Sequence, residues 1–154
     1  MLAVEIWLST WQKINKFGEL SMNNEYGNMS LYELINTESN QLQTGASEEM
    51  ISKFESENNM TLPCEYKELL KYSNGASLFA GDVILFSLSN DKKAFKTIDD
   101  NLLVIGKYNF GDLLCINLET ETVVQWSIEN NNIFLEHFNI KDWIIFSIEE
   151  MEFV

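Results

Sequence analysis

The side chains best suited to catalysis in this chain are one histidine and two cysteines. His137 lies in the segment IFLEHF, and Cys64 and Cys115 lie far from each other and from His137 along the chain. A nucleophilic triad needs a nucleophile, a base and an orienting carboxylate in contact, and the sequence connects neither thiol to His137. The cysteines form no CxxC pair and match no metal-ligand spacing. We therefore expect two reduced, packed thiols, a non-catalytic surface or half-buried histidine and no metal site.

The motifs of the large enzyme classes do not occur in the sequence. There is no GxxxxGK[ST] phosphate loop, no GxGxxG, no HExxH and no GxSxG. Adjacent acids such as Asp99-Asp100 and Glu149-Glu150 are expected by chance in a chain with 24 acidic residues, and neighbours on a helix or strand point in different directions. We predict a protein that is not an enzyme and binds no cofactor. A small hydrolase that uses Cys64 or His137 is the alternative from another class.

The charge of the chain indicates what kind of partner it binds. The formal net charge is -14, from 24 acidic and 10 basic residues. Acidic residues outnumber basic ones most strongly in the segment from Glu121 onward. Such a surface repels phosphate backbones and anionic lipids, so binding to nucleic acid or to a membrane surface is disfavoured. A basic protein partner is favoured instead. The alternative is that the acidity serves only solubility.

The length of 154 residues fits one compact domain with a real core. The opening MLAVEIWLSTWQKINK has no basic leader and carries Glu5, so it does not look like a secretory signal. No run approaches the roughly 18 apolar residues of a membrane span. These features predict a cytoplasmic protein.

The first half of the chain is predicted to form helices, which would help to position any site. Apolar residues recur at helical spacing from Val4 to Ile14, and residues 21–45 form a polar connection with one short apolar island at 31–35. We divide the domain into residues 1–45, a helix and a poorly fixed connection, and residues 46–154. Ser47 is expected to cap the next helix, and Pro63 is expected at the first position of the one after it. That helix should bury Leu62, Tyr66, Leu69 and Leu70 and end at Asn74-Gly75.

The second half of the chain is predicted to form strands followed by a helix. Short β-branched and apolar runs start at Val83, Leu102, Leu113, Val123 and Ile133. Tight links between them predict an antiparallel meander of about five strands, with a short surface helix within residues 91–100. Residues 140–148 return to helical spacing. The sequence thus predicts an α+β fold with helices around an antiparallel sheet.

The stretch MISKFESENNMTLPCEYKELLKYSNGA, residues 50–76, resembles the signature of the SUKH superfamily, in particular its Smi/Knr type. The second matching block is GDLLCINLETETVVQWSIE, residues 111–129, and the resemblance covers about residues 46–150. Asn58-Asn59 and Ala76 replace glycines that are frequent in that family. The residues that carry the family motif are Glu55, Leu62, Pro63, Tyr66, Asn74, Gly75 and Trp126.

The resemblance implies a curved antiparallel sheet flanked by helices and no shared set of catalytic residues. It also implies an immunity protein, an antitoxin that binds and neutralises a polymorphic bacterial toxin such as a nuclease. The alternative is a housekeeping adaptor similar to the fungal members that act in cell-wall regulation.

Contact residues for a basic toxin domain are expected among acids in loops, at strand ends and near the C-terminus, because complementary potentials speed association and select partners. The tryptophans Trp7, Trp11, Trp126 and Trp143 are predicted to be core residues, with anchoring of a protein interface as the alternative. The predicted partner-binding acids are Asp82, Asp99, Asp100, Asp112, Glu149 and Glu150.

Overall fold

The computed structural model describes residues 25–88, 98 and 101–152. The predicted first helix, with Trp7 and Trp11, lies outside the described residues, and so does nearly all of the predicted surface helix within 91–100. The chain divides into two units, Met1–Ser30 and Leu31–Val154. The described part of the first unit contains the 3-10 helix η1, Glu25–Asn28. The second unit contains every other described element.

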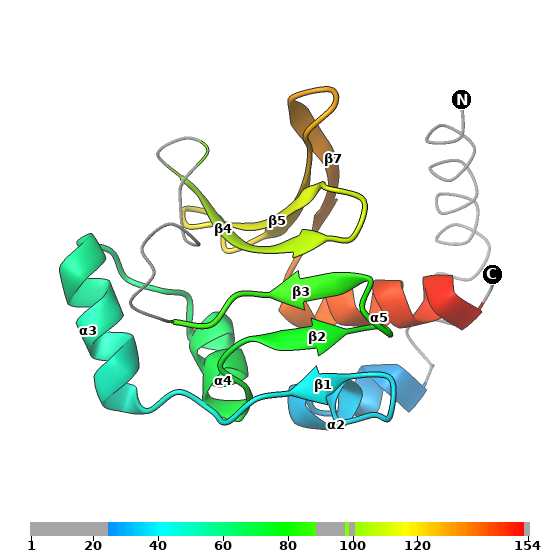
Figure 1. The fold of residues 1–154 in the computed structure, drawn as a ribbon, viewed down its shortest axis with the longest axis horizontal. Coiled ribbons are helices and arrows are strands. Elements are labelled where there is room, and N and C mark those ends of the chain that lie inside the picture. The colour runs from blue at the N-terminus through cyan, green and yellow to red at the C-terminus, as the bar shows by residue number, and fades with distance from the viewer. Residues whose placement is uncertain (1–24, 89–97, 99–100, 153–154) are drawn as a thin grey trace. The chain divides into compact units, whose positions relative to one another are not determined.

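The second unit is built on one antiparallel sheet, shown in Figure 1. Its strands are hydrogen-bonded in chain order from β1 to β7, so the predicted antiparallel meander in an α+β fold is confirmed. The sheet has seven strands rather than about five, because β1 and β2 are short and lack the β-branched residues that mark the equally short β3 in the sequence. The strands are β1 Gln41–Leu42, β2 Ala76–Leu78, β3 Val83–Leu85, β4 Leu102–Tyr108, β5 Leu113–Asn117, β6 Val123–Ser127 and β7 Asn132–His137.

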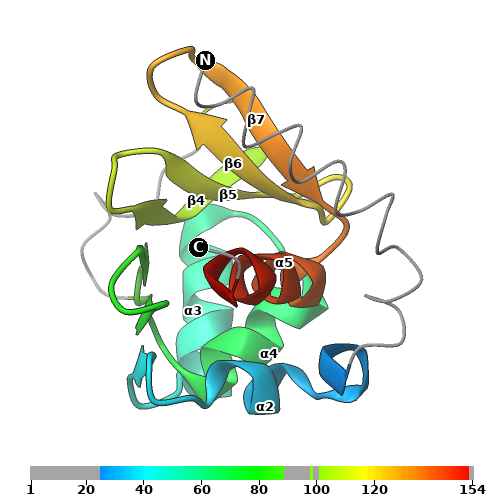
Figure 2. The same ribbon diagram turned by 90° about the vertical axis from the view of Figure 1, so that its right-hand side faces the viewer.

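The sheet is strongly curved around the last helix, α5, which spans Ile140–Glu152. Figure 2 looks along α5 and shows β4–β7 above it and the shorter strands beside it. Register shifts interrupt the β4–β5 and β6–β7 pairs, and such bulges bend and twist a sheet. At the first bulge, β3 approaches so closely that a side chain on Gly106 would lie 2.5 Å from the carbonyl oxygen of Ile84. The curvature lets one helix fill much of the space inside the sheet.

Helix α2 precedes β1, and helices α3 and α4 lie between β1 and β2. Helix α2, Leu31–Ile35, confirms the predicted apolar island and buries Leu31, Leu34 and Ile35. Helix α3, Glu48–Asn58, starts as predicted, because the hydroxyl of Ser47 accepts a hydrogen bond from the Met50 N–H at 3.1 Å. It ends at Asn59, whose φ of 49° is the left-handed conformation usually taken by glycine.

Helix α4, Cys64–Tyr72, buries the predicted face of Leu62, Tyr66, Leu69 and Leu70. Pro63 is its N-cap rather than its first helical residue, because its ψ of 145° is extended and its carbonyl already accepts from the Lys67 N–H. The helix also ends earlier than predicted, with Ser73 as an extended C-cap, so the positive φ of Gly75 turns the chain into β2.

The core lies between the sheet and helices α2, α4 and α5. Trp143 and Ile144 of α5 are fully buried, which confirms the core role predicted for Trp143. A second cluster of buried residues, Leu102, Val104, Cys115 and Val124, lies across β4, β5 and β6, and Trp126 packs against it half-buried. None of the helices within the described ranges is long and apolar enough to span a bilayer.

Candidate functional site

The residues of the family motif form joints between elements. The Glu55 carboxylate accepts a hydrogen bond from the Leu62 N–H at 2.7 Å and lies 3.3 Å from the Lys67 ammonium group, so it connects α3 to the start of α4. The Asn74 side chain accepts from the Leu88 N–H at 2.7 Å. Each of these polar groups therefore holds backbone in place after α3 or after α4.

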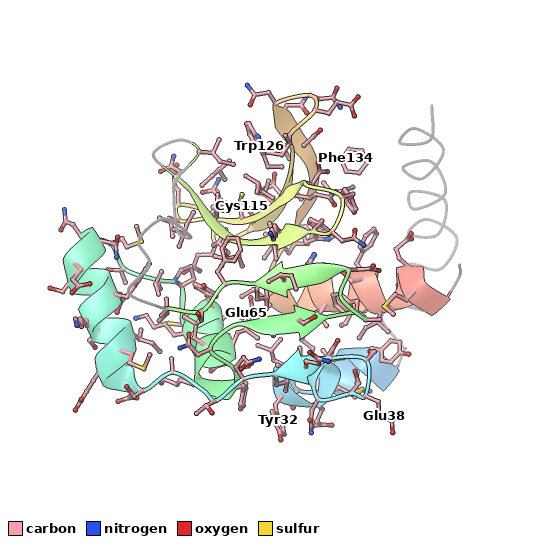
Figure 3. The ribbon with its side chains drawn as sticks, viewed as in Figure 1. Tyr32, Glu38, Glu65, Cys115, Trp126 and Phe134 are labelled. Carbon is pink, nitrogen blue, oxygen red and sulfur yellow. The ribbon has the colours of Figure 1, made fainter. Side chains whose placement is uncertain are left out.

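Glu65 of α4, labelled in Figure 3, joins segments that are further apart along the chain than those joined by Glu55 or Asn74. Its carboxylate accepts hydrogen bonds from the Ile140 N–H at 2.6 Å and the Lys141 N–H at 3.2 Å. Asn139 adds a third, from the Asp142 N–H to its side-chain oxygen at 2.7 Å. The first turn of α5 thus receives an acceptor and a negative charge at the positive end of its dipole.

The residues considered for catalysis lie on different elements. Cys64 begins α4 and is exposed, contrary to the packed position predicted for it, because it lies on the turn of α4 opposite the buried face. Cys115 is buried in β5, as predicted, and Figure 3 labels it beside the half-buried Trp126. His137 ends β7 half-buried with its ring 4.8 Å from that of Phe146, and burial lowers its pKa to about 4. The imidazole is therefore neutral at physiological pH.

Three of the predicted partner-binding acids lie close together. Asp82 is exposed in the turn between β2 and β3, Asp112 is in the turn between β4 and β5, and Glu150 is in the last turns of α5. Asp82 and Glu150 line the same cleft. Glu149 is half-buried beside Glu150 and does not line it, and Asp99 and Asp100 lie outside the described residues.

This cleft has a volume of about 540 Å³ and is the candidate binding site. It lies where the β2–β3 turn, the β4–β5 turn and the C-terminal half of α5 meet, at the red end of α5 in Figure 1. Its walls are mainly aromatic and apolar, and none of the described residues that line it is basic. The lining residues are Phe79, Asp82, Val83, Tyr108, Asn109, Phe110, Gln125, Phe146, Ser147, Glu150 and Met151.

Hydrogen bonds fix the two turns at the mouth of the cleft. Asn109 donates its backbone N–H to the Asp82 carbonyl at 2.8 Å and its side-chain N–H to the Asp82 carboxylate at 3.1 Å. The Asp112 carboxylate accepts from Gln125 Nε2 at 2.9 Å and from the Ile128 N–H at 3.3 Å. Asp112 therefore holds Gln125, a lining residue, in place, and Asn109 holds Asp82.

Aromatic contacts connect the cleft to the core. The Phe110 ring stacks on Tyr108 with 5.2 Å between ring centroids, and the Tyr108 hydroxyl accepts a hydrogen bond from the Trp143 indole at 3.1 Å. The buried Phe79 ring lies edge-on to Trp143 at 5.9 Å. Burial raises the pKa of Tyr108 to about 12, and the Trp143 hydrogen bond only partly offsets this. The phenol is therefore neutral across the physiological range.

The aromatic part of the cleft was missed by the sequence analysis. One signal was available: Phe110 lies in Asn-Phe-Gly-Asp, between two strands, where turn residues are usually small and polar. The side chains of Phe79, Tyr108 and Phe146 could not be assigned to one site, because they come from three separate elements. Within the described ranges, no group of three or more His, Cys, Asp or Glu side chains is placed to hold a metal ion.

Comparison with known protein families identifies the family of this chain. The model of the SMI1 / KNR4 family (SUKH-1) matches residues 45–146, about two thirds of the chain. The match runs from just before α3 to Phe146 in α5, so Ser147, Glu150 and Met151 of the cleft lie beyond it. A search of curated proteins found no match.

Proposed function

Because the chain belongs to the SMI1 / KNR4 family (SUKH-1), we propose that it is an immunity protein that binds and neutralises a basic toxin domain. The observation that carries the proposal is the gathering of Asp82, Asp112 and Glu150 around an aromatic cleft without a basic lining residue among those described. A protein with a formal net charge of -14 would attract such a domain over a distance set by the ionic strength.

The roles of the motif residues support binding rather than catalysis. The carboxylates of Glu55 and Glu65, two charged residues of the motif region, both accept hydrogen bonds from backbone N–H groups. His137 packs against a phenylalanine ring and is neutral, and the exposed Cys64 lies on another element. We propose that the protein is not an enzyme and acts in the cytoplasm, where an incoming toxin would meet its target.

The proposed mechanism is occlusion. A nuclease toxin needs a basic surface for its substrate, because nucleic-acid binding is dominated by contacts to phosphates. An acidic protein surface that occupies those basic residues competes directly with the nucleic acid, and the field of the whole molecule accelerates the encounter. Inhibition would then be stoichiometric and would weaken as salt is added.

The test is to co-express the protein with the C-terminal domain of a toxin-like protein encoded beside its gene. We expect the two chains to co-purify and the toxin's activity to fall to background at a one-to-one ratio. A toxin domain from an unrelated locus, matched in isoelectric point, is the control. The proposal is abandoned if no complex forms and no protection is seen. A growth defect on deletion of the gene, without any competitor present, would favour a housekeeping adaptor instead.

A further inference from the structure

We infer that the cleft at Phe110 is the primary docking site for a basic segment of the protein partner, in which a lysine or arginine lies next to an apolar residue. The cation would meet Asp82 and Glu150, and the apolar neighbour would pack on Phe110. This inference rests on the proposed function, since it names the surface and the chemistry through which the toxin domain is bound.

Phe110 provides the apolar contact of the proposed site. Its side chain is 65% exposed although it stacks on Tyr108 and lies over an apolar cavity. A large aromatic ring in a hairpin turn is unfavourable in water, and aromatic anchors at the mouth of a pocket are typical of the few residues that carry most of the binding energy. Closing a partner over Phe110 and Met151 would remove both side chains from water.

The rim of the cleft provides the charged contacts. Asp82 and Glu150 are the charged residues among those that line the cleft, and both are acidic. Asp82 accepts one hydrogen bond from Asn109, and a carboxylate has about four acceptor positions, so it can accept others from a guanidinium or ammonium group. The stacked rings of Phe110 and Tyr108 add electron-rich faces that attract a cation. A cation with an apolar neighbour fits this surface better than an anion or a purely apolar segment.

Hydrogen bonds hold the two turns of the site in place without a partner. The two Asn109 hydrogen bonds join the β4–β5 turn to Asp82. In the β2–β3 turn, Phe79 and Ala80 both hold a left-handed φ of 55°, and Asn40 accepts from the Phe79 N–H at 2.7 Å. Groups held in this way lose little conformational entropy on binding, which favours affinity.

Phe138 offers a matched control. It is 85% exposed and lines a different cavity, of about 400 Å³, together with Pro63 and Cys64. Two acids line that cavity: Glu121, and Glu65, which already accepts two hydrogen bonds from the start of α5. Phe138 is therefore a second exposed phenylalanine, at a cavity that shares no lining residue with the cleft at Phe110, and it tests whether the loss of any exposed ring weakens binding.

The experiment measures binding of the neighbouring toxin domain to the full chain by titration calorimetry and stopped flow. We expect Phe110→Ser to weaken binding by about tenfold or more, the loss typical of a central aromatic contact. Phe110→Lys should weaken it further, since it brings a like charge to the incoming cation. Asp82→Asn keeps an acceptor for Asn109 and should lower the association rate and its dependence on salt. Phe138→Ser should stay within about twofold of the wild type.

The outcomes separate the two proposals. Failure of the wild-type chain to bind or inhibit the toxin domain would overturn the proposed function and this inference with it. Normal inhibition combined with unchanged binding by Phe110→Ser and Phe110→Lys would overturn the docking site and leave the proposed function standing. A loss of binding by Phe138→Ser as large as that of Phe110→Ser would likewise assign docking to another surface. Thermal unfolding of each variant checks that all of them are folded.

Discussion

Glu65 shows how one side chain can join two distant helices. It lies in the first turn of α4, and its carboxylate accepts two N–H groups at the start of α5, 75 and 76 residues further along the chain. These N–H groups have no carbonyl partner within α5, because the first turn of any helix leaves its donors free. In the sequence, Glu65 is only one letter of the quoted stretch 50–76, and the contact with α5 follows from the tertiary structure.

Replacing Glu65 by glutamine should therefore destabilise the fold. Glu65→Gln keeps one acceptor oxygen but removes the charge near the helix dipole, so we expect a loss of about 1 to 2 kcal/mol in the free energy of unfolding. Urea unfolding followed by circular dichroism measures it. Glu68→Gln, on an exposed position of the same helix, is the control and should change stability by less than about 0.5 kcal/mol. Equal effects of the two variants would contradict the capping role.

Tyr66 carries a buried hydroxyl that has no hydrogen-bond partner among the described residues. Burial raises the pKa of this phenol, so it is neutral. An unpaired buried polar group costs about 1 to 3 kcal/mol. We expect Tyr66→Phe to leave the free energy of unfolding unchanged or to raise it by about 1 kcal/mol, whereas Tyr66→Leu should lower it by about 2 kcal/mol or more through the cavity it leaves. A clear loss in Tyr66→Phe would show that the hydroxyl is paired.

At the scale of elements, β7 and α5 are held together by ring packing. His137 ends the last strand and lies on Phe146 in the middle of α5. Burial of the imidazole opposes its charged form, so its pKa is about 4 in the folded chain and about 6.5 in the unfolded chain. Between these values only the unfolded chain takes up the proton. The stabilising contribution of neutral His137 is complete above pH 6.5 and is lost as the pH falls to about 4.

This linkage predicts how the β7–α5 contact responds to acid. The wild type should lose about 2 to 3 kcal/mol more stability than His137→Gln between pH 7 and pH 4. Carboxylates titrate in both proteins, so the difference between the two curves isolates the histidine. Chemical unfolding at half-unit pH steps provides the measurement. Parallel curves for the two proteins would mean that His137 is solvated in the folded state.

At the scale of the whole molecule, the excess of acidic residues opposes folding while it favours a basic partner. A formal net charge of -14 on 154 residues produces self-repulsion in the compact state. Salt screens that repulsion, since the Debye length falls from about 30 Å at 0.01 M to about 8 Å at 0.15 M. The same screening weakens attraction to a basic domain, so stability and association should respond to salt in opposite directions.

We therefore expect the thermal unfolding midpoint of the free protein to rise when sodium chloride is increased from 0.01 to 0.15 M at pH 7. Differential scanning calorimetry measures the shift. The control is the same pair of scans near pH 4.3, the isoelectric point, where the net charge is close to zero and the shift should be much smaller. A midpoint that does not move at pH 7, or that moves equally at both pH values, would show that self-repulsion contributes little to the stability of the free protein.

Local signals in the sequence determined much of the fold. The cap at Ser47, the buried face of Leu62, Tyr66, Leu69 and Leu70, and strands β3 to β7 are encoded within runs of a few residues, so they were predicted. Strands β1 and β2 were missed because they are short and, unlike the equally short β3, contain no β-branched residue. The role of Pro63 as N-cap depends on its ψ, which residue type does not set.

Composition and local spacing are enough to establish the negative charge, the antiparallel order of strands and the family. Which acids meet aromatic side chains depends on how distant segments pack in the folded chain. Asp82 and Asn109 are 27 residues apart, yet they are in contact at the cleft. Phe79 and Trp143 are 64 apart by their numbering, yet their contact joins the cleft to the core. Such contacts follow from the curvature of the sheet around α5 and from strand register, which bring together segments that share no local pattern.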